Sequence, residues 1–189
     1  YLVVELPTGP AGATLNLETV TDLSAEFKLG SGASVVLDDG QAPIQVDGKW
    51  WYWVKGDAGA TGTLSITWLK ETWSYSDADG KEVFAPGGAY QDADNVWQAE
   101  SASTAASIPV FMAPYIDVRL VASASGEIDE ATLQSFATSG ITLFRKESAG
   151  DVELSRLSAA INKKSYVSLG GGKIRLFFDP QDSDGIKAG

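Results

Sequence analysis

The sequence predicts an all-β protein, and three observations support that prediction. Short apolar segments follow one another closely in the first half of the chain, and several alternate apolar and polar residues as half-buried strands do. Asp-Gly pairs at 39–40 and 47–48 separate such segments as turns would. Helical spacing of apolar residues occurs in two windows, 129–140 and 151–161. We therefore expect antiparallel β-sandwich, jelly-roll-like domains with one or two short inserted helices.

The predicted strands of the first half are short and closely spaced. They span residues 1–7, 13–20, 25–29, 33–37, 49–55 and 63–69. In the second of these segments, Leu15 and Leu17 would lie on one face and Asn16 and Glu18 on the other. The sequence GSG at 30–32 predicts a hairpin connection between the segments on either side of it.

The second half mixes turn-rich stretches, strands and helices. Residues 74–114 are rich in small and turn-forming residues, whereas clear strands are predicted at 115–123, 140–146 and 172–179. The glycine triplet at 170–172 lacks the features of a phosphate loop, so we expect a turn there. Asp129 would cap a helix that ends at Gly140, with Leu133 and Phe136 on one side. The apolar residues that predict a second helix over 151–161 are Leu154, Leu157 and Ile161.

The composition excludes several classes of function. The chain of 189 residues contains no histidine and no cysteine, which removes serine–histidine triads, thiolate metal sites and disulfides. A net charge of −11 argues against a nucleic-acid partner, since lysine and arginine supply most of the affinity for phosphates. No apolar run approaches the roughly 20 residues that a membrane-spanning helix needs, so we expect no membrane insertion.

An aromatic run at 50–53 is the main candidate for a binding surface. In a strand, Trp50 and Tyr52 would share one face and Trp51 and Trp53 the other, so both faces would be aromatic. We interpret one face as core and the other as a contact with a neighbouring subunit or domain. The alternative is a platform on which sugar rings stack. Further aromatic candidates for either role are Trp68, Trp73 and Trp97.

The glycines at 56, 59 and 62 follow a Gly-X-Y period but are too few for a collagen triple helix. The order of an aromatic strand, KGDAGATG and a new strand resembles the connectors of bacteriophage tail-fibre and baseplate adhesion proteins. The stretches GATLNLETVTDL, GSGASVVLDDGQ and WYWVKGDAGATG resemble the small β domains upstream of such connectors. The stretch PYIDVRLVASASGEIDEATLQSFATSGITLFRK is similar to the closing strands of jelly-roll domains on phage tail proteins.

This resemblance implies a homotrimeric, virion-attached, non-enzymatic protein. Its partners would be other tail proteins and a host surface glycan, and no receptor-binding residue is carried over because such residues vary between fibres. We expect residues 1–62 to form a small β domain that ends in the glycine-rich connector. Residues 63–189 would form a β-sandwich domain that is truncated at its C-terminus.

The many carboxylates suggest two further chemistries. A glycosidase needs only two carboxyl groups at a set separation, and acidic residues near tryptophans are candidates: Glu71, Asp92, Asp94 and Glu100. Segments with carboxylates two residues apart are candidates for calcium loops: Asp77 and Asp79, Asp92 and Asp94, Asp182 and Asp184. None completes an EF-hand, so we interpret these segments as ordinary turns and expect no cofactor. Because the chain has no histidine, no cysteine and no recognisable acid/base pair, we expect no hydrolytic activity.

Two functions from different classes follow from the sequence. The leading hypothesis is a structural and adhesion segment of a phage tail fibre or baseplate, located in the virion tail. The alternative is a carbohydrate-binding module or glycan-active enzyme fragment of a secreted or cell-surface bacterial protein. Oligomeric state discriminates them, because a fibre segment should be trimeric and a module monomeric with its aromatic rings in water.

Overall fold

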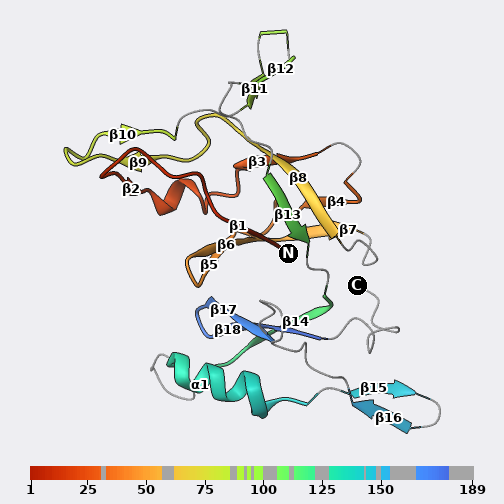
Figure 1. Cartoon of the computed structure of the whole chain (residues 1–189). Coiled ribbons are helices and arrows are strands. Elements are labelled where there is room, and N and C mark those ends of the chain that lie inside the picture. Colours follow the sequence, from red (N-terminus) through yellow and green to blue (C-terminus); the bar gives the residue numbers. More distant parts are fainter. Residues whose placement is uncertain are drawn as a thin grey trace. The chain divides into compact units, whose positions relative to one another are not determined.

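The computed structural model divides the chain into two compact units, Tyr1–Phe111 and Met112–Gly189 (Figure 1). The residues that the structure describes are 1–30, 33–56, 62–85, 89–91, 93–94, 96–99, 106–110, 113–121, 128–142, 144–147, 150–153 and 165–178. In these ranges the prediction of an all-β protein is confirmed, because small antiparallel sheets dominate and a single short α-helix accompanies them. The predicted boundary between residues 62 and 63 lies inside the first unit. Of the glycine-rich connector predicted over 56–62, residues 57–61 lie outside the described ranges.

The first unit is built on a sheet of six described strands, in the order β3-β8-β13-β1-β6-β5. Every neighbouring pair in this sheet is antiparallel. Leu2 in β1 pairs with both Tyr52 and Val110, so β1 lies inside the sheet, and the side chains of Leu2 and Val4 are buried. The strands of this sheet are β1 (Leu2–Val4), β3 (Phe27–Leu29), β5 (Ile44–Val46), β6 (Lys49–Tyr52), β8 (Gly62–Trp68) and β13 (Ala106–Val110).

The first unit also contains smaller antiparallel sheets. A three-stranded sheet has the order β10-β9-β2, and two further sheets are the pairs β4-β7 and β11-β12 (Figure 1). Their strands are β2 (Thr14–Leu15), β4 (Val35–Leu37), β7 (Val54–Gly56), β9 (Tyr75–Ser76), β10 (Glu82–Val83), β11 (Ala89–Gln91) and β12 (Trp97–Ala99).

The strand predicted over 13–20 is wrong in its second half. After β2 the chain enters a short 3-10 helix, η1 (Leu17–Thr19). The side chain of Asn16 accounts for this change, because its Nδ2 donates to Ser74 Oγ at 2.8 Å and its Oδ1 accepts from Ser76 Oγ at 2.7 Å. Such side-chain hydrogen bonds compete with a continuing strand ladder. The alternation of leucines therefore marks only the two residues of β2 as strand.

The hairpin predicted across 30–32 is also wrong. β3 pairs with β8, whereas β4 pairs with β7, so the two neighbouring segments enter different sheets. The Gly30 N–H donates to Ser65 O at 2.7 Å and continues the partnership of β3 with β8. The alternating pattern of a strand specifies which face is buried, but it does not specify the partner strand.

The turn predicted at 47–48 is confirmed. Asp47 and Gly48 have φ values of 53° and 79°, as a two-residue hairpin turn with positive φ at both positions requires. This turn connects β5 to β6, with Val46 paired to Lys49. The strand predicted at 49–55 does not continue through Trp53, because β6 ends before it and β7 begins after it in another sheet.

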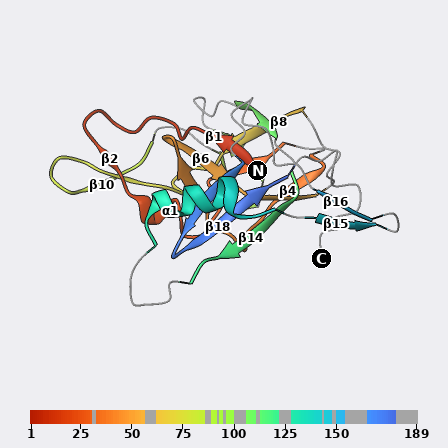
Figure 2. The same cartoon turned by 90° about the horizontal axis from the view of Figure 1, so that it is seen from below.

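The second unit contains a three-stranded antiparallel sheet in the order β14-β18-β17. Its strands are β14 (Tyr115–Arg119), β17 (Tyr166–Gly170) and β18 (Lys173–Phe177). The helix α1 (Glu130–Ser135) covers one face of this sheet (Figure 2). The buried core between them consists of Leu133, Ala137, Ile174, Leu176 and Phe178.

The predicted helix at 129–140 is confirmed in position and in its cap. The Asp129 side chain accepts from the Thr132 N–H at 2.6 Å, as an N-cap does. The last turn, Phe136–Gly140, has π-helical hydrogen bonding. Leu133 is buried and Phe136 packs against the same core, so the predicted apolar side faces the sheet.

The helix predicted over 151–161 is wrong where the structure describes it. Residues 151–153 belong to β16 (Gly150–Glu153), which pairs with β15 (Phe144–Glu147) in an antiparallel ladder. This ladder places Val152 opposite Arg145, and a strand partner this close in sequence overrides a helical period carried mainly by later residues. Residues 154–164, which carry the rest of that prediction, lie outside the described ranges.

Candidate functional site

The aromatic candidates whose side chains the structure describes are core residues. Their exposed fractions lie between 3 % and 6 %. These residues are Trp50, Trp51, Tyr52, Trp53, Trp68 and Trp73. Such burial leaves no open ring face for a sugar to stack on, so a glycan role would require these rings to become exposed. A role at a subunit contact or with a glycan stays a prediction, and the side chain of Trp97 is outside the described set.

Specific ring contacts hold this aromatic core together. The Phe27 ring makes edge contacts with Tyr52 and Trp68, at centroid distances of 4.8 Å and 5.4 Å. Trp68 makes a further edge contact with Trp73 at 5.3 Å. Edge contacts of this kind add to the stabilisation from buried area, because the positive ring edge meets the negative ring face. Aromatic side chains from β3, β6 and β8 therefore form one continuous cluster.

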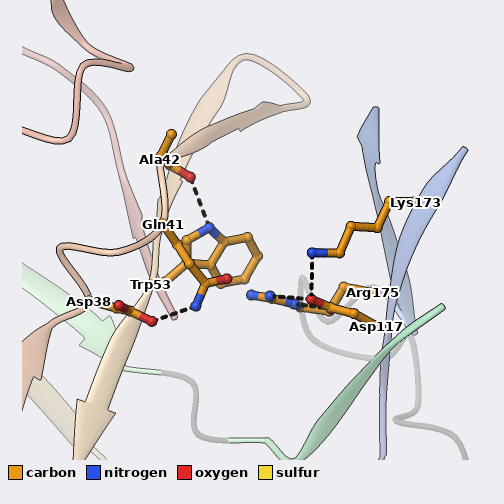
Figure 3. A network of polar contacts seen from close by, with 7 residues as sticks. All are labelled: Asp38, Gln41, Ala42, Trp53, Asp117, Lys173 and Arg175. Atoms are coloured by element: carbon orange, nitrogen blue, oxygen red, sulfur yellow. Dashed lines mark hydrogen bonds and ion pairs between the residues drawn. The ribbon is translucent and has the colours of Figure 1, made fainter. Parts of the chain in front are cut away.

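Trp53 lies at the point where the chain leaves the six-stranded sheet. Its indole Nε1 donates to Ala42 O at 3.0 Å (Figure 3). Its carbonyl accepts from the Asp38 N–H at 2.9 Å. A buried indole needs a partner for its N–H, and the Ala42 carbonyl supplies it. This residue therefore fixes the loop between β4 and β5 to the junction of two sheets.

Asp38 is a buried carboxylate beside that junction. It pairs with Lys55 Nζ at 2.7 Å and accepts from the Gly40 N–H at 3.1 Å. It also accepts from Gln41 Nε2 (Figure 3). Burial acts to raise the pKa of Asp38, but hydrogen bonds from Lys55, Gln41 and Gly40 outweigh it and lower that pKa. The carboxylate is thus fully engaged in organising the turn after β4.

A second charged cluster lies on the sheet of the second unit. Arg175 Nε and Nη2 donate to the two oxygens of Asp117 at 2.8 Å and 2.9 Å, and Lys173 Nζ lies 3.0 Å from the same carboxylate (Figure 3). The Arg175 guanidinium also lies 3.8 Å from the centroid of the Tyr115 ring. Burial acts to raise the pKa of Asp117, and the hydrogen bonds from Arg175 and Lys173 lower it overall.

A third polar group, Glu26, is completely buried next to the aromatic core. Its side chain is 0 % exposed, and neither carboxylate oxygen has a hydrogen-bond partner in the described structure. Burial raises the pKa of Glu26 to about 7. The Tyr52 hydroxyl and the backbone of Glu26 itself act to lower this pKa, and the charge of Asp22 adds a smaller increase. Tyr52 responds in turn, because burial and the neighbouring Glu26 raise its pKa.

The sequence pattern did not single out Glu26 or Arg175. Each shares a short stretch with one lysine, AEFKL or KIRLFF, and alternation predicts a solvent-facing position for both charged residues of the stretch. Arg175 has a detectable signal in hindsight, because its β18 strand is apolar on both sides of it and such runs are buried on both faces. Glu26 has no comparable signal.

The calcium and catalytic candidates are scattered. Asp77 Oδ1 accepts from the N–H groups of Asp79 and Lys81 at 3.0 Å and 2.8 Å, which organises the turn between β9 and β10. Glu71 has a φ of 58° and its carboxylate lies 3.8 Å from Lys70, and Asp94 is exposed. In the described ranges no three acidic side chains converge as a metal site would require. The candidates outside those ranges are Asp92, Glu100, Asp182 and Asp184.

Comparisons with known proteins complete the description of the site. No model of a protein family, no curated protein and no solved structure matches the chain. Among the residues that the structure covers, no helix is both long enough and apolar enough to cross a membrane.

Proposed function

We propose that the chain is a non-catalytic structural and adhesion segment of a multi-subunit surface assembly, of the kind found in phage tail fibres and baseplates. One observation carries the proposal: the aromatic candidates with described side chains, Trp50–Trp53, Trp68 and Trp73, are buried in the interior of the antiparallel β framework of the first unit. Tightly packed aromatic cores resist deformation, which suits a segment that transmits load between a virion and its host.

The engaged carboxylates support the same proposal. Asp38 and Asp117 are held by cations and N–H donors, while Asp77 and Asp129 each organise a turn or a helix terminus. Each of these groups stabilises local structure, and a catalytic carboxylate would instead be directed at a bound substrate. The net charge of −11 also fits this proposal, because mutual repulsion would keep copies of an adhesion segment soluble at high local concentration.

The test is the mass of the intact chain in solution. Sedimentation equilibrium should give three times the 19.9 kDa of one chain, as a homotrimeric fibre segment requires. A monomer at all concentrations would overturn the trimer. Binding of that monomer to an array of bacterial glycans, without release of reducing ends, would favour a carbohydrate-binding module instead. Release of reducing ends would overturn the non-catalytic assignment.

A further inference from the structure

Glu26 and Tyr52 form a polar pair without the hydrogen bonds that buried groups usually make. Both carboxylate oxygens of Glu26 and the hydroxyl of Tyr52 are buried and lack a partner of full hydrogen-bond geometry in the described structure. Each nevertheless shifts the pKa of the other, so the two groups are neighbours. Buried polar groups are almost always hydrogen-bonded, so an exception of this kind calls for a physical explanation.

The position of this pair links it to an outer strand of the sheet. Glu26 directly precedes β3, which lies at one edge of the six-stranded sheet. The Glu26 carbonyl accepts from the Leu69 N–H at 2.8 Å, just beyond the end of β8. Phe27, the next residue, contacts the Tyr52 ring of β6. A displacement of the Glu26 side chain would therefore disturb the first contacts that hold β3 on the sheet.

The charged groups around Glu26 do not neutralise an ionised carboxyl. Tyr52 from β6 is neutral over the physiological range, and Asp22 from the segment before β3 carries a like charge. At the end of β8, the Lys70 amine is 3.8 Å from the Glu71 carboxylate. Lys28, on β3 itself, is not among the groups that shift the pKa of Glu26. An ionised Glu26 would therefore be a buried charge without a counter-ion, which is a strongly unfavourable arrangement.

We propose that Glu26 and Tyr52 act as a pH-sensitive latch, which holds β3 on the sheet while the carboxyl is protonated and releases β3 when the carboxyl ionises. In the closed form, the neutral carboxyl shares a hydrogen bond with the Tyr52 hydroxyl after a small side-chain adjustment. On ionisation the proton goes to solvent, and the carboxylate reaches water by displacing the start of β3. The Leu69 N–H then loses its acceptor.

The direction of the effect follows from proton linkage. The pKa of Glu26 is raised from 4.5 when exposed to about 7 in the folded unit. The contribution of Glu26 to closing is therefore fully present below a pH of about 4.5 and decreases as the pH rises. It is lost above a pH of about 7. Between these two pH values the equilibrium constant for closing falls by roughly two orders of magnitude.

Hydrogen exchange of single amides tests the latch in the intact chain. We expect the protection of the Leu69 N–H, corrected for intrinsic exchange, to fall about 100-fold between about pH 5 and pH 8. The Leu120 N–H, which donates to Gly172 O in the second unit, serves as an internal reference and should hold its protection. Equal protection of Leu69 at both pH values would overturn the latch.

Two variants separate the latch from the general effect of charge. Glu26→Gln keeps the shape but cannot ionise, so its Leu69 protection should change less than about threefold over the same range. Glu18→Gln removes one exposed carboxylate and should retain the wild-type response. An equal fall in wild type and Glu26→Gln would overturn the proposal. If Glu26→Gln does not fold, the carbon NMR titration of Glu26 decides: a midpoint near 7 supports the latch and one near 4.5 overturns it.

Discussion

The ring of Tyr1 lies flat against the indole of Trp51, with ring centroids 4.2 Å apart and planes 3° from parallel. A second indole, that of Trp53, meets the edge of the same tyrosine at 6.4 Å. Tyr1 directly precedes β1, so its ring extends the pairing of β1 with β6 by side-chain contact. All four aromatic side chains of the run at 50–53 are therefore buried in the first unit, although alternation along a strand would direct them to two opposite faces.

Removal of the Trp51 side chain should destabilise the first unit strongly. We expect Trp51→Ala to lower the free energy of unfolding by about 3–5 kcal/mol, because a large buried side chain leaves a cavity and loses its stacking partner. All six tryptophans lie in the first unit, so urea titration followed by tryptophan fluorescence reports on it. Val36→Ala, at a 62 % exposed position, should change that free energy by less than about 1 kcal/mol. Equal losses would contradict the core assignment.

The Asp117–Arg175 pair should behave as a buried ion pair. Asp117→Asn leaves the guanidinium, which is 1 % exposed, without its counter-ion, and we expect a loss of about 3 kcal/mol in the second unit. Combining it with Arg175→Met should recover part of that loss, because the unpaired charge is gone. Hydrogen exchange of the Phe178 N–H, which donates to Pro114 O, measures the second unit directly. A double variant less stable than Asp117→Asn would refute this account.

Acid should weaken the first unit through Asp38. The folded pKa of Asp38 is lower than its usual value of 3.8, so its stabilisation is present above 3.8 and is lost as the pH falls through the folded value. Thermal melts followed by tryptophan fluorescence should show this loss in wild type. Asp38→Asn should melt lower near neutral pH but lose less on acidification. Identical acid responses in both proteins would exclude Asp38 as the source.

The turn at Asp47–Gly48 should tolerate asparagine better than alanine. Gly48 has a φ of 79° and no heavy atom near the position of a Cβ, so any penalty comes from the backbone and not from a clash. We expect Gly48→Ala to cost about 1 kcal/mol and Gly48→Asn clearly less, since asparagine adopts the left-handed region more readily. Urea titration of the two variants provides the comparison. Equal losses would show that the left-handed backbone is not the limiting factor.

The sequence predicted elements well where one local pattern decided them. β8, β14 and α1 carry clear periods of two or 3.6, and the Asp129 cap is local. β13 was missed because Pro109 and small residues predict a turn, and proline is rare inside a sheet. Strand partners, and with them the boundary between units, depend on contacts between distant segments that no local period records.

The candidate site was less predictable than the fold. The aromatic run was recognised, but alternation alone could not specify what covers its second face. Trp51, on that face of β6, is covered by the stacked ring of Tyr1. The burial of Glu26 and Arg175 depends on what the neighbouring strands bring against them. A charged residue that alternates with apolar residues looks the same in sequence whether it faces water or an aromatic core.

The insertion of β13 between β1 and β8 sets the order in which a nascent chain can assemble. Leu2 finds its partner Val110 only after nearly all of the first unit has left the ribosome. Until then β1 with β6 and β3 with β8 are separate pieces, each with an unpaired inner edge. Folding of this unit should therefore be slow and late, and the incomplete chain should need a chaperone to keep those edges from pairing with other chains.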